Sequence, residues 1–417
     1  MTSASDCCAP ADLAAPIAAS PLIPVTAPYG AAIAQLSLGM GGLAIGTGEF
    51  ASMGVLPQVA NSVGASIPQA GHMISAYALG VTVGAPLIAV AMARAPRRAL
   101  LIGLMLFYLA GNALSALAPD YLSVVAARFV AGLPHGAYFG VAMLFAASMV
   151  PANKRAQAVG NVLLGLSIAN VVGVPAATWL GQTLGWRTTF VAVSALAGLT
   201  ALLIRLTTPE VSPSAEASPL RELGALRRLQ VWLTLGVAAV GFGGIFAVYS
   251  YISPTLTEVS GLPLALVPAM LSVLGLGMIA GNIVGGWLSD RALKATMVGC
   301  LVWSAAALGL FTLASANPWT AGVNLFLIGC CIAMGPALQT RLMDVAGDAQ
   351  TLAAALNHSA FNVANALGAW LGGLAVAAGY GWTAPGWVGM LLALAGLGVL
   401  LASLALERAE AAPARMR

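Results

Sequence analysis

Long apolar runs separated by short polar breaks dominate the chain. A bilayer core of about 30 Å is crossed by roughly 20 apolar residues in a helix. Twelve runs meet that length, at approximately 36–56, 70–92, 99–118, 121–147, 157–180, 187–206, 230–254, 265–288, 296–314, 320–340, 353–376 and 386–406. Because lipid cannot hydrate backbone groups, each run has to close its own hydrogen bonds as a helix. The pattern predicts an all-α membrane protein with twelve transmembrane helices.

The composition excludes the soluble classes of protein. Of the 417 residues, 60% are hydrophobic and only 7% are charged, whereas soluble domains carry about 25% charged residues. So few charges cannot cover the surface of a water-soluble chain of this length. The sequence has no basic face, no phosphate-binding loop and no His-Glu-x-x-His motif. We therefore expect no nucleic-acid binding, no cofactor, no metal site and no enzymatic activity.

The positive charges lie at alternate breaks between the spans. Fifteen of the 17 Lys and Arg residues fall in every second loop or after the last span, and only Arg128 and Arg187 lie elsewhere. Loops rich in Lys and Arg stay on the cytoplasmic side of a membrane. We therefore expect both termini in the cytoplasm, with the proline-rich segment 1–34 as a disordered tail and 408–417 as a second tail.

The two halves of the chain repeat one another across the one long polar break, 207–229. Ala169-Asn170-x-x-Gly173 recurs as Ala364-Asn365-x-x-Gly368 after 195 residues, and Pro57 recurs as Pro254 after 197. Repeated halves are typical of transporters whose site lies between them near the bilayer midplane. The repeat predicts two pseudo-symmetric six-helix bundles, 35–206 and 230–407, joined by 207–229 as a cytoplasmic linker.

Several short motifs carry a family likeness. They are Gly286-Trp287-Leu288-Ser289-Asp290-Arg291 after the eighth span, Arg128 with Gly132 and Gly136 in the fourth, and Gly165 with Gly173-Val174-Pro175 in the fifth. Over about 36–406 the chain resembles the major facilitator superfamily, in its drug:proton antiporter family near the sugar- and phenicol-efflux branch. The resemblance implies alternating access in a bacterial inner membrane. The fifth-span motif is associated with exporters, so the resemblance also implies efflux.

The resemblance also implies roles for the loop charges and for the small residues of the motifs. The first-half copy of the loop motif has Ala93 where the family carries Asp, but its three arginines remain. The expected gating residues are Arg94, Arg97, Arg98, Asp290, Arg291 and Lys294, and the helix-motif residues are Gly132, Gly173 and Pro175.

Glu49 and Arg128 are ionisable residues inside predicted spans. Such a group costs about 2.5–3.5 kcal/mol on insertion scales, so it usually has a partner or a function. From the spacing, Glu49 lies roughly 21 Å from the cytoplasmic entry of its span and Arg128 roughly 10 Å from the opposite face, so both share one depth. Two interpretations stay open: Glu49 carries a coupled proton, or the two residues form a permanent structural ion pair.

The remaining candidates are polar or aromatic side chains in the spans. His135 lies deeper than Arg128 and is either a proton relay or a packed histidine, because imidazole titrates near neutral pH. His358 either contacts substrate or ties helices together. The expected substrate-binding residues are Phe50, Tyr138, Asn170, Tyr249, Tyr251, His358, Asn362 and Asn365. Tyr249 and Tyr251 are two residues apart and cannot both face the same cavity.

The sequence thus predicts a secondary transporter that exports a small organic solute in exchange for protons. Proton-coupled uptake and a transport-dead membrane sensor or scaffold are the alternatives. The expected partners are the lipid bilayer, protons and a small-molecule substrate, for which drugs, sugars, nucleosides and lipophilic cations are all compatible. Because two bundles enclose a complete site, a monomer suffices.

Overall fold

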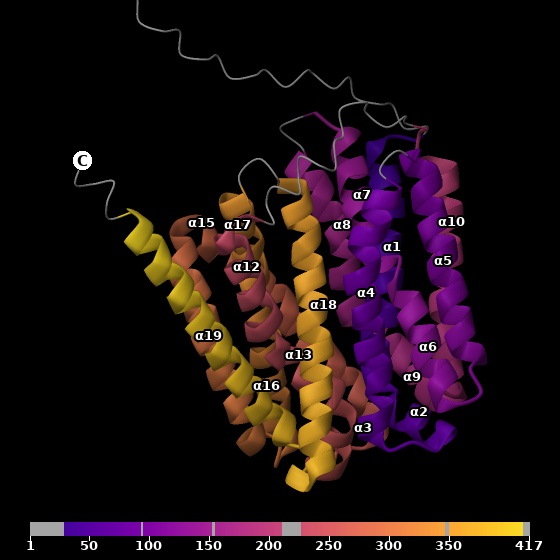
Figure 1. Ribbon diagram of the computed structural model, residues 1–417. Coiled ribbons are helices and arrows are strands. Elements are labelled where there is room, and N and C mark those ends of the chain that lie inside the picture. The colour runs from indigo at the N-terminus through magenta and orange to yellow at the C-terminus, as the bar shows by residue number, and fades with distance from the viewer. Residues whose placement is uncertain (1–28, 93–94, 152–154, 211–226, 347–349, 412–417) are drawn as a thin grey trace, which may run out of the picture.

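The computed structural model describes residues 29–92, 95–151, 155–210, 227–346 and 350–411 (Figure 1). Within these ranges the chain is helical and contains no strand. Eleven helical stretches are long and apolar enough to cross a membrane. One of them, Leu264–Ala314, holds two predicted spans, because the backbone leaves the helical conformation at Ala292 (φ −153°, ψ 68°). The all-α fold with twelve predicted spans is confirmed.

The first half of the chain forms one bundle. Its elements are α1 (Ala31–Gly54), α2 (Leu56–Val63), α3 (Ile67–Ala70), α4 (His72–Ala91), α5 (Arg97–Leu117), α6 (Tyr121–Gly132), α7 (His135–Ser148), α8 (Arg155–Ile168), the π-helix η2 (Ala169–Gly173), α9 (Val174–Leu184) and α10 (Arg187–Thr207).

The second half forms the other bundle. Its elements are α12 (Leu229–Gly236), η4 (Val237–Gly241), α13 (Gly243–Ser250), α14 (Ile252–Pro254), η5 (Thr255–Val259), η6 (Leu264–Leu266), α15 (Val267–Ala314), α16 (Pro318–Gly329), η7 (Cys330–Ala333), α17 (Met334–Ala346), α18 (Gln350–Ala375), η8 (Val376–Tyr380) and α19 (Ala384–Ala411).

The two bundles stand side by side and contact one another along two seams. In one seam α4 packs against α18, and in the other α15 packs against η2 and α9. Helix α1 begins and helix α19 ends at the same end of the molecule, the top of Figure 1, which we name the terminal end. The predicted tail residues 1–28, the linker residues 211–226 and Arg94 lie outside the described residues.

Close helix packing repeats between the halves at an offset of 197 residues. A Cβ at Gly80 in α4 would lie 2.2 Å from the carbonyl oxygen of Phe129, and a Cβ at Gly277 in α15 would lie 2.2 Å from that of Phe326. Only glycine permits helices to approach so closely. The repeated motifs therefore correspond to a repeated three-dimensional packing, as the predicted pseudo-symmetry requires.

A proline creates one of the contacts between the halves. Pro175 has no N–H, so the carbonyl of Val171 one turn earlier loses its helical partner. The chain before it winds as the π-helix η2, and the Oγ of Ser272 on α15 donates to the Val171 carbonyl at 3.1 Å. A Cβ at the preceding Gly173 would lie 2.1 Å from the Oγ1 of Thr47 on α1. The fifth-span motif thus fits this helix between the first and eighth spans.

We predict that Gly132→Ala destabilises the protein, whereas Gly140→Ala in the same span does not. A Cβ at Gly132 would lie 2.1 Å from the carbonyl oxygen of Tyr77, but a Cβ at Gly140 would meet nothing within 4 Å. Overpacking of this kind costs about 1–3 kcal/mol. Thermal unfolding of the purified protein in detergent measures the difference, and equal unfolding midpoints for the two variants would contradict the packing described.

Candidate functional site

Glu49 lies at the interface between the two bundles. It is buried, with 7% of its surface exposed, on α1 of the first bundle. Its Oε1 accepts a hydrogen bond from the Nδ2 of Asn365, on α18 of the second bundle, at 3.0 Å. Asn365 was expected among the substrate-binding residues, and in this structure it is the direct partner of the buried acid.

Arg128 lies next to the same turn of α1. Its side chain has no exposed surface, and its Nη2 donates to the carbonyl oxygen of Gly48 at 3.0 Å while its Nη1 donates to the Oδ1 of Asn112 at 3.2 Å. The guanidinium carbon lies 4.3 Å from the ring centroid of Tyr77 and 5.1 Å from that of Phe190. Because Gly48 precedes Glu49, the predicted shared depth of the two charges is confirmed.

The direct ion pair that was one interpretation of these charges does not form. Both residues are described, and no guanidinium nitrogen of Arg128 lies within the 4.0 Å of a Glu49 oxygen that defines an ion pair. The two side chains still interact electrostatically. Arg128 is held by neutral groups of its own bundle, and Glu49 is held by a neutral amide of the opposite bundle.

Two polar atoms beside Glu49 stay unsatisfied. Within the described chain, the Nε of Arg128 and the Oδ1 of Asn365 are buried and have no hydrogen-bond partner. Buried polar groups nearly always have a partner, so each exception calls for an explanation. One of these atoms is a donor and the other an acceptor, and both belong to residues that surround the acid.

A chain of hydrogen bonds places His135 in the first bundle. Its Nδ1 lies 3.0 Å from the hydroxyl oxygen of Tyr77, which donates to the hydroxyl of Tyr108 at 3.4 Å. Tyr108 in turn donates to the carbonyl oxygen of Ile45, one turn before Glu49, at 3.2 Å. His135 is therefore hydrogen-bonded within its bundle, on the terminal side of Arg128. A relay role for His135 stays a prediction.

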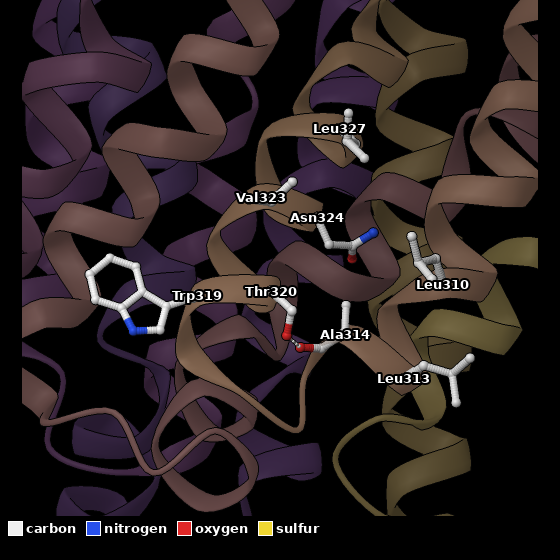
Figure 2. A pocket seen from close by; sticks show the side chains of 8 residues that line it. All are labelled: Leu310, Leu313, Ala314, Trp319, Thr320, Val323, Asn324 and Leu327. Carbon is white, nitrogen blue, oxygen red and sulfur yellow. Dashed lines mark hydrogen bonds between the residues drawn. The ribbon is translucent and has the colours of Figure 1, made fainter.

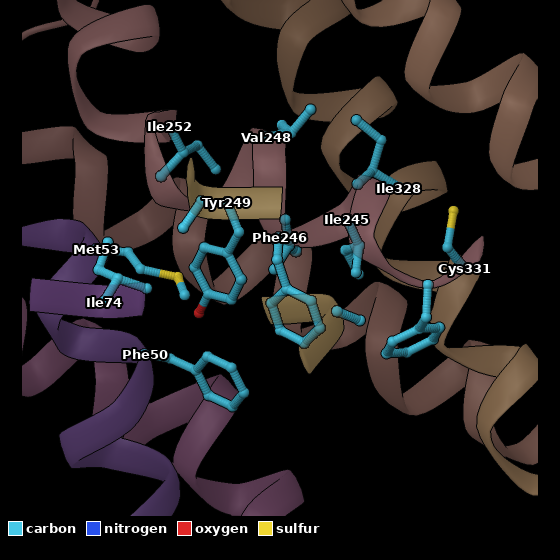
Figure 3. Packing of buried hydrophobic residues seen from close by; sticks show 14 of the residues in the cluster. Phe50, Met53, Ile74, Ile245, Phe246, Val248, Tyr249, Ile252, Ile328 and Cys331 are labelled. Atoms are coloured by element: carbon cyan, nitrogen blue, oxygen red, sulfur yellow. The ribbon is translucent and has the colours of Figure 1, made fainter. Parts of the chain in front are cut away.

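Aromatic rings meet across the interface one residue beyond the acid. The ring of Phe50 stacks on that of Tyr249 at 5.4 Å between centroids and on that of Phe246 at 6.4 Å (Figure 3). Tyr249 is fully buried, and its hydroxyl has no hydrogen-bond partner among the described residues. Phe246 is the repeat counterpart of Glu49, so the second bundle presents a ring at the position where the first presents a carboxylate.

The expected histidine of the second bundle also contacts the first. The ring of His358 on α18 stacks on that of Phe139 on α7, with 5.7 Å between the centroids. On the same helix, the amide nitrogen of Asn362 donates to the carbonyl of His358 at 2.9 Å. On η2, in the other seam, the amide nitrogen of Asn170 donates to the carbonyl of Leu166 at 3.0 Å. Within the described ranges, the Oδ1 atoms of both asparagines are buried without a partner.

The hydroxyls of two expected substrate residues are used within their own bundles. Tyr138 donates to the carbonyl of Leu38 at 2.8 Å, and Tyr251 donates to the carbonyl of Ala369 at 2.9 Å. Both tyrosines are almost fully buried. These hydrogen bonds indicate a role in packing, and of the Tyr249–Tyr251 pair it is Tyr249 whose hydroxyl has no partner among the described residues.

Three of the six expected gating residues interact within their own halves. Arg98 pairs with Glu210 at 3.2 Å and also donates to the carbonyl of Arg205, and Lys294 pairs with Glu407 at 2.9 Å. The guanidinium of Arg291 lies over the ring of Trp287, whereas Asp290 is exposed and Arg97 is half-buried. In the part of the chain that is described, no ion pair joins the two bundles. Their expected gating role stays a prediction.

A shallow hollow lies on the second bundle, between α15 and α16 (Figure 2). Its lining is apolar apart from Thr320 and Asn324, and the Nδ2 of Asn324 donates to the carbonyl of Ala307 at 3.0 Å. Asn324 is the approximate repeat counterpart of Arg128, so the second bundle carries a neutral residue there. None of the predicted site residues lines this hollow.

Comparison with known proteins identifies the family. Residues 38–357 match the model of the Major Facilitator Superfamily. The chain belongs to this superfamily. Among curated relatives of this facilitator, the inner membrane transport protein YdhP of Escherichia coli (strain K12) is 41% identical over 88% of this chain and 94% of that protein. The chloramphenicol resistance protein of Streptomyces lividans is 34% identical over 84% of this chain and 91% of that protein.

The structural comparison supports the same fold. A bacterial homologue of the human lysosomal transporter Spinster, in an inward-facing and unoccupied conformation, superposes with a TM-score of 0.68 and 18% identity, covering 91% of this chain and 96% of that chain. Together with the family match, this makes the facilitator a multi-pass membrane transporter.

We predict that Arg128→Lys destabilises the protein more than Arg187→Lys does. Both arginines donate two hydrogen bonds and lie over an aromatic ring, but Arg128 is fully buried whereas Arg187 is partly exposed. A lysine cannot reproduce the planar fork, and a lost hydrogen bond to a charged group costs about 1.5–3 kcal/mol. Thermal unfolding measures the stability of both variants. An equal loss of stability would show that the burial of Arg128 does not add to the cost of replacing it.

Proposed function

We propose that this protein exports a small organic solute by proton antiport with alternating access, and that Glu49 carries the proton. The observation that supports this most strongly is the hydrogen bond between Glu49 and Asn365, because it joins the acid of one bundle to the other bundle. When the bundles rock apart, this contact is lost and the acid meets water. The proton affinity of Glu49 and the position of the bundles are then coupled.

The absence of a direct ion pair favours a coupling role over a static one. A permanent Glu49–Arg128 pair would keep the carboxylate charged in every conformation, because a nearby cation stabilises the charged form. Arg128 instead donates hydrogen bonds from Nη1 to Asn112 and from Nη2 to the Gly48 carbonyl. The positive charge of Arg128 still lowers the free energy of the Glu49 carboxylate, but without a direct ion pair it does not hold Glu49 in the charged form.

The proposed direction is supported by the loop charges, by the fifth-span motif and by a relative. We place the terminal end in the cytoplasm of a bacterial inner membrane, as the Lys and Arg distribution favours. The fifth-span motif around Pro175 resembles that of exporters and here organises a contact between bundles. A transporter confers resistance to a drug by lowering its internal concentration, so similarity to a chloramphenicol resistance protein supports export.

The substrate would bind between the bundles beside Glu49. Phe50, Phe246 and Tyr249 offer ring faces there, and the Tyr249 hydroxyl and the Asn170 and Asn362 carbonyl oxygens are polar atoms without a partner in the described chain. Ligand sites combine apolar walls with a few polar groups that fix orientation. This composition favours a partly aromatic solute with hydrogen-bond donors, and a monomer supplies the complete site.

We predict that Glu49→Gln abolishes proton-driven efflux. The purified protein is reconstituted into liposomes that hold a proton gradient and an internal pH dye. A transported compound should collapse the gradient with the wild-type protein but not with Glu49→Gln. Chloramphenicol, sugars, nucleosides and lipophilic cations form the test panel. The matched control is Glu258→Gln, which changes an exposed acid at the end opposite the terminal end and should transport like wild type. Proton-driven transport by Glu49→Gln at the wild-type rate would refute the proposal.

We predict that Tyr249→Phe weakens substrate binding without destabilising the protein, and that Tyr251→Phe does the reverse. The Tyr249 hydroxyl has no partner among the described residues, whereas the Tyr251 hydroxyl donates to Ala369. A net hydrogen bond is worth about 0.5–1.5 kcal/mol, which corresponds to roughly a 2- to 10-fold change in dissociation constant. Calorimetric titration and thermal unfolding separate the two effects, and unchanged affinity in Tyr249→Phe would remove this residue from the site.

A further inference from the structure

The side-chain amide of Asn365 is half-satisfied in a way that matches a carboxylic acid. Its Nδ2 donates to the Oε1 of Glu49, while its Oδ1 is buried and, within the described chain, accepts nothing. A carboxylate has no hydrogen to offer, but a protonated carboxyl group carries one O–H donor beside its acceptor oxygen. The unsatisfied Oδ1 is therefore the atom that the proton of Glu49 would need.

We propose that the proton is held between the bundles as a cyclic acid–amide pair of Glu49 and Asn365, which locks the conformation seen here. In this pair Asn365 donates from Nδ2 to Oε1, and the protonated Oε2 of Glu49 donates to Oδ1 of Asn365. The inference rests on the proposed proton antiport. It makes Asn365 a positioning residue, which holds the protonated carboxyl group of Glu49. Two hydrogen bonds then join α1 to α18 in place of one.

Loss of the proton gives the acid a different partner. A Glu49 carboxylate would face the oxygen of Asn365 across the interface with nothing to donate, and it would be drawn toward Arg128, whose Nε is buried without a partner in the described residues. Each of the two unpartnered atoms thus finds its partner in one state. The Oδ1 of Asn365 would accept from the protonated acid, and the Nε of Arg128 would donate to the carboxylate. The second state keeps Glu49 within its own bundle and lets the bundles separate.

The other titratable groups around Glu49 do not supply a competing lock between the bundles. Those that interact electrostatically with it are Arg128 of α6, Tyr77 of α4, Tyr108 of α5 and Tyr249 of α13. The first three belong to the same bundle as Glu49, and the hydroxyl of Tyr249 has no partner in the described chain. Asn365 is the residue of the second bundle that hydrogen-bonds the acid.

The proton balance of the cycle follows directly. With the site open to the periplasm, hydronium transfers one proton to a Glu49 oxygen and leaves water. The neutral acid pairs with Asn365 as the bundles close on that side. With the site open to the cytoplasm, the O–H bond breaks, one proton passes to cytoplasmic water, and the carboxylate turns toward Arg128. One proton enters and one leaves, and no other reactant is consumed.

The test measures the distance between the bundles as a function of pH, with no substrate and no gradient. Spin labels at Asn61 and Glu258, exposed residues of opposite bundles at the end away from the terminal end, report the distance in a background without the native cysteines. In wild type, lower pH should raise the population with the short distance, by up to about tenfold per pH unit for one linked proton.

Three variants decide the outcome. Glu49→Gln supplies an amide with the same donor and acceptor as the protonated acid, so its short-distance population should be high at every pH. Asn365→Leu should lose the pH dependence. Asn357→Leu, about two turns earlier on the same helix, is the matched control: Asn357 is also buried, but its amide donates to Gln339 of its own bundle, so this variant should keep the wild-type pH dependence.

The proposal is overturned if Asn365→Leu keeps the wild-type pH dependence, or if Glu49→Gln fails to favour the short distance. These results are independent of the transport assay. Wild-type pH dependence in Asn365→Leu together with a loss of proton-driven efflux in Glu49→Gln would leave antiport intact and remove only the acid–amide pair. Proton-driven efflux by Glu49→Gln would instead remove the proposed function itself.

Discussion

A carboxyl group at the depth of Glu49 has no lipid partner, so the protein must supply its entire environment. The cost of leaving such a group unsatisfied is several kcal/mol, a large part of the net stability of about 5–15 kcal/mol typical of a folded protein. The chain meets this cost with a neutral amide from the opposite bundle and a buried guanidinium held nearby. Because half of that environment belongs to the moving bundle, any rocking motion changes what surrounds the acid. In the proposed mechanism, this one hydrogen bond links alternating access to the protonation of Glu49.

The two halves share their packing but differ in their polar residues. Glycines at matching positions let α4 approach α6 and let α15 approach α16 in the same way. Glu49 and Arg128, however, occur in the first half, and the corresponding positions of the second half hold Phe246 and approximately Asn324. The first bundle thus contains the acid and its cation, while the second contributes an amide and aromatic rings. Repetition of the packing gives two similarly built bundles, and the difference in polarity gives them different side chains at their interface.

The parts of this arrangement that depend on one helix were predictable from the sequence. Span length, loop charge and the repeat gave the spans and the two bundles, and a rise of 1.5 Å per residue placed Glu49 and Arg128 at one depth. Contacts between bundles were not predictable, because they depend on how two rigid bodies meet. Asn365 was recognised as polar and repeated but not as the partner of Glu49, and Ser272 was missed. Pro175 did carry a usable signal, since a proline always frees the carbonyl four residues earlier. The hydroxyls of Tyr138 and Tyr251 were expected at the site, but carbonyls of their own bundles take them.

The central claim is that one buried acid holds the proton that is exchanged for substrate. The most direct test is to count the protons released when substrate binds to purified protein in weakly buffered detergent solution, where no gradient or membrane intervenes. Wild type should release protons on binding, most strongly at pH values where Glu49 is protonated before substrate arrives, and Glu49→Gln should bind without releasing any. Equal release by the two proteins would contradict the account and place the exchanged proton on another residue.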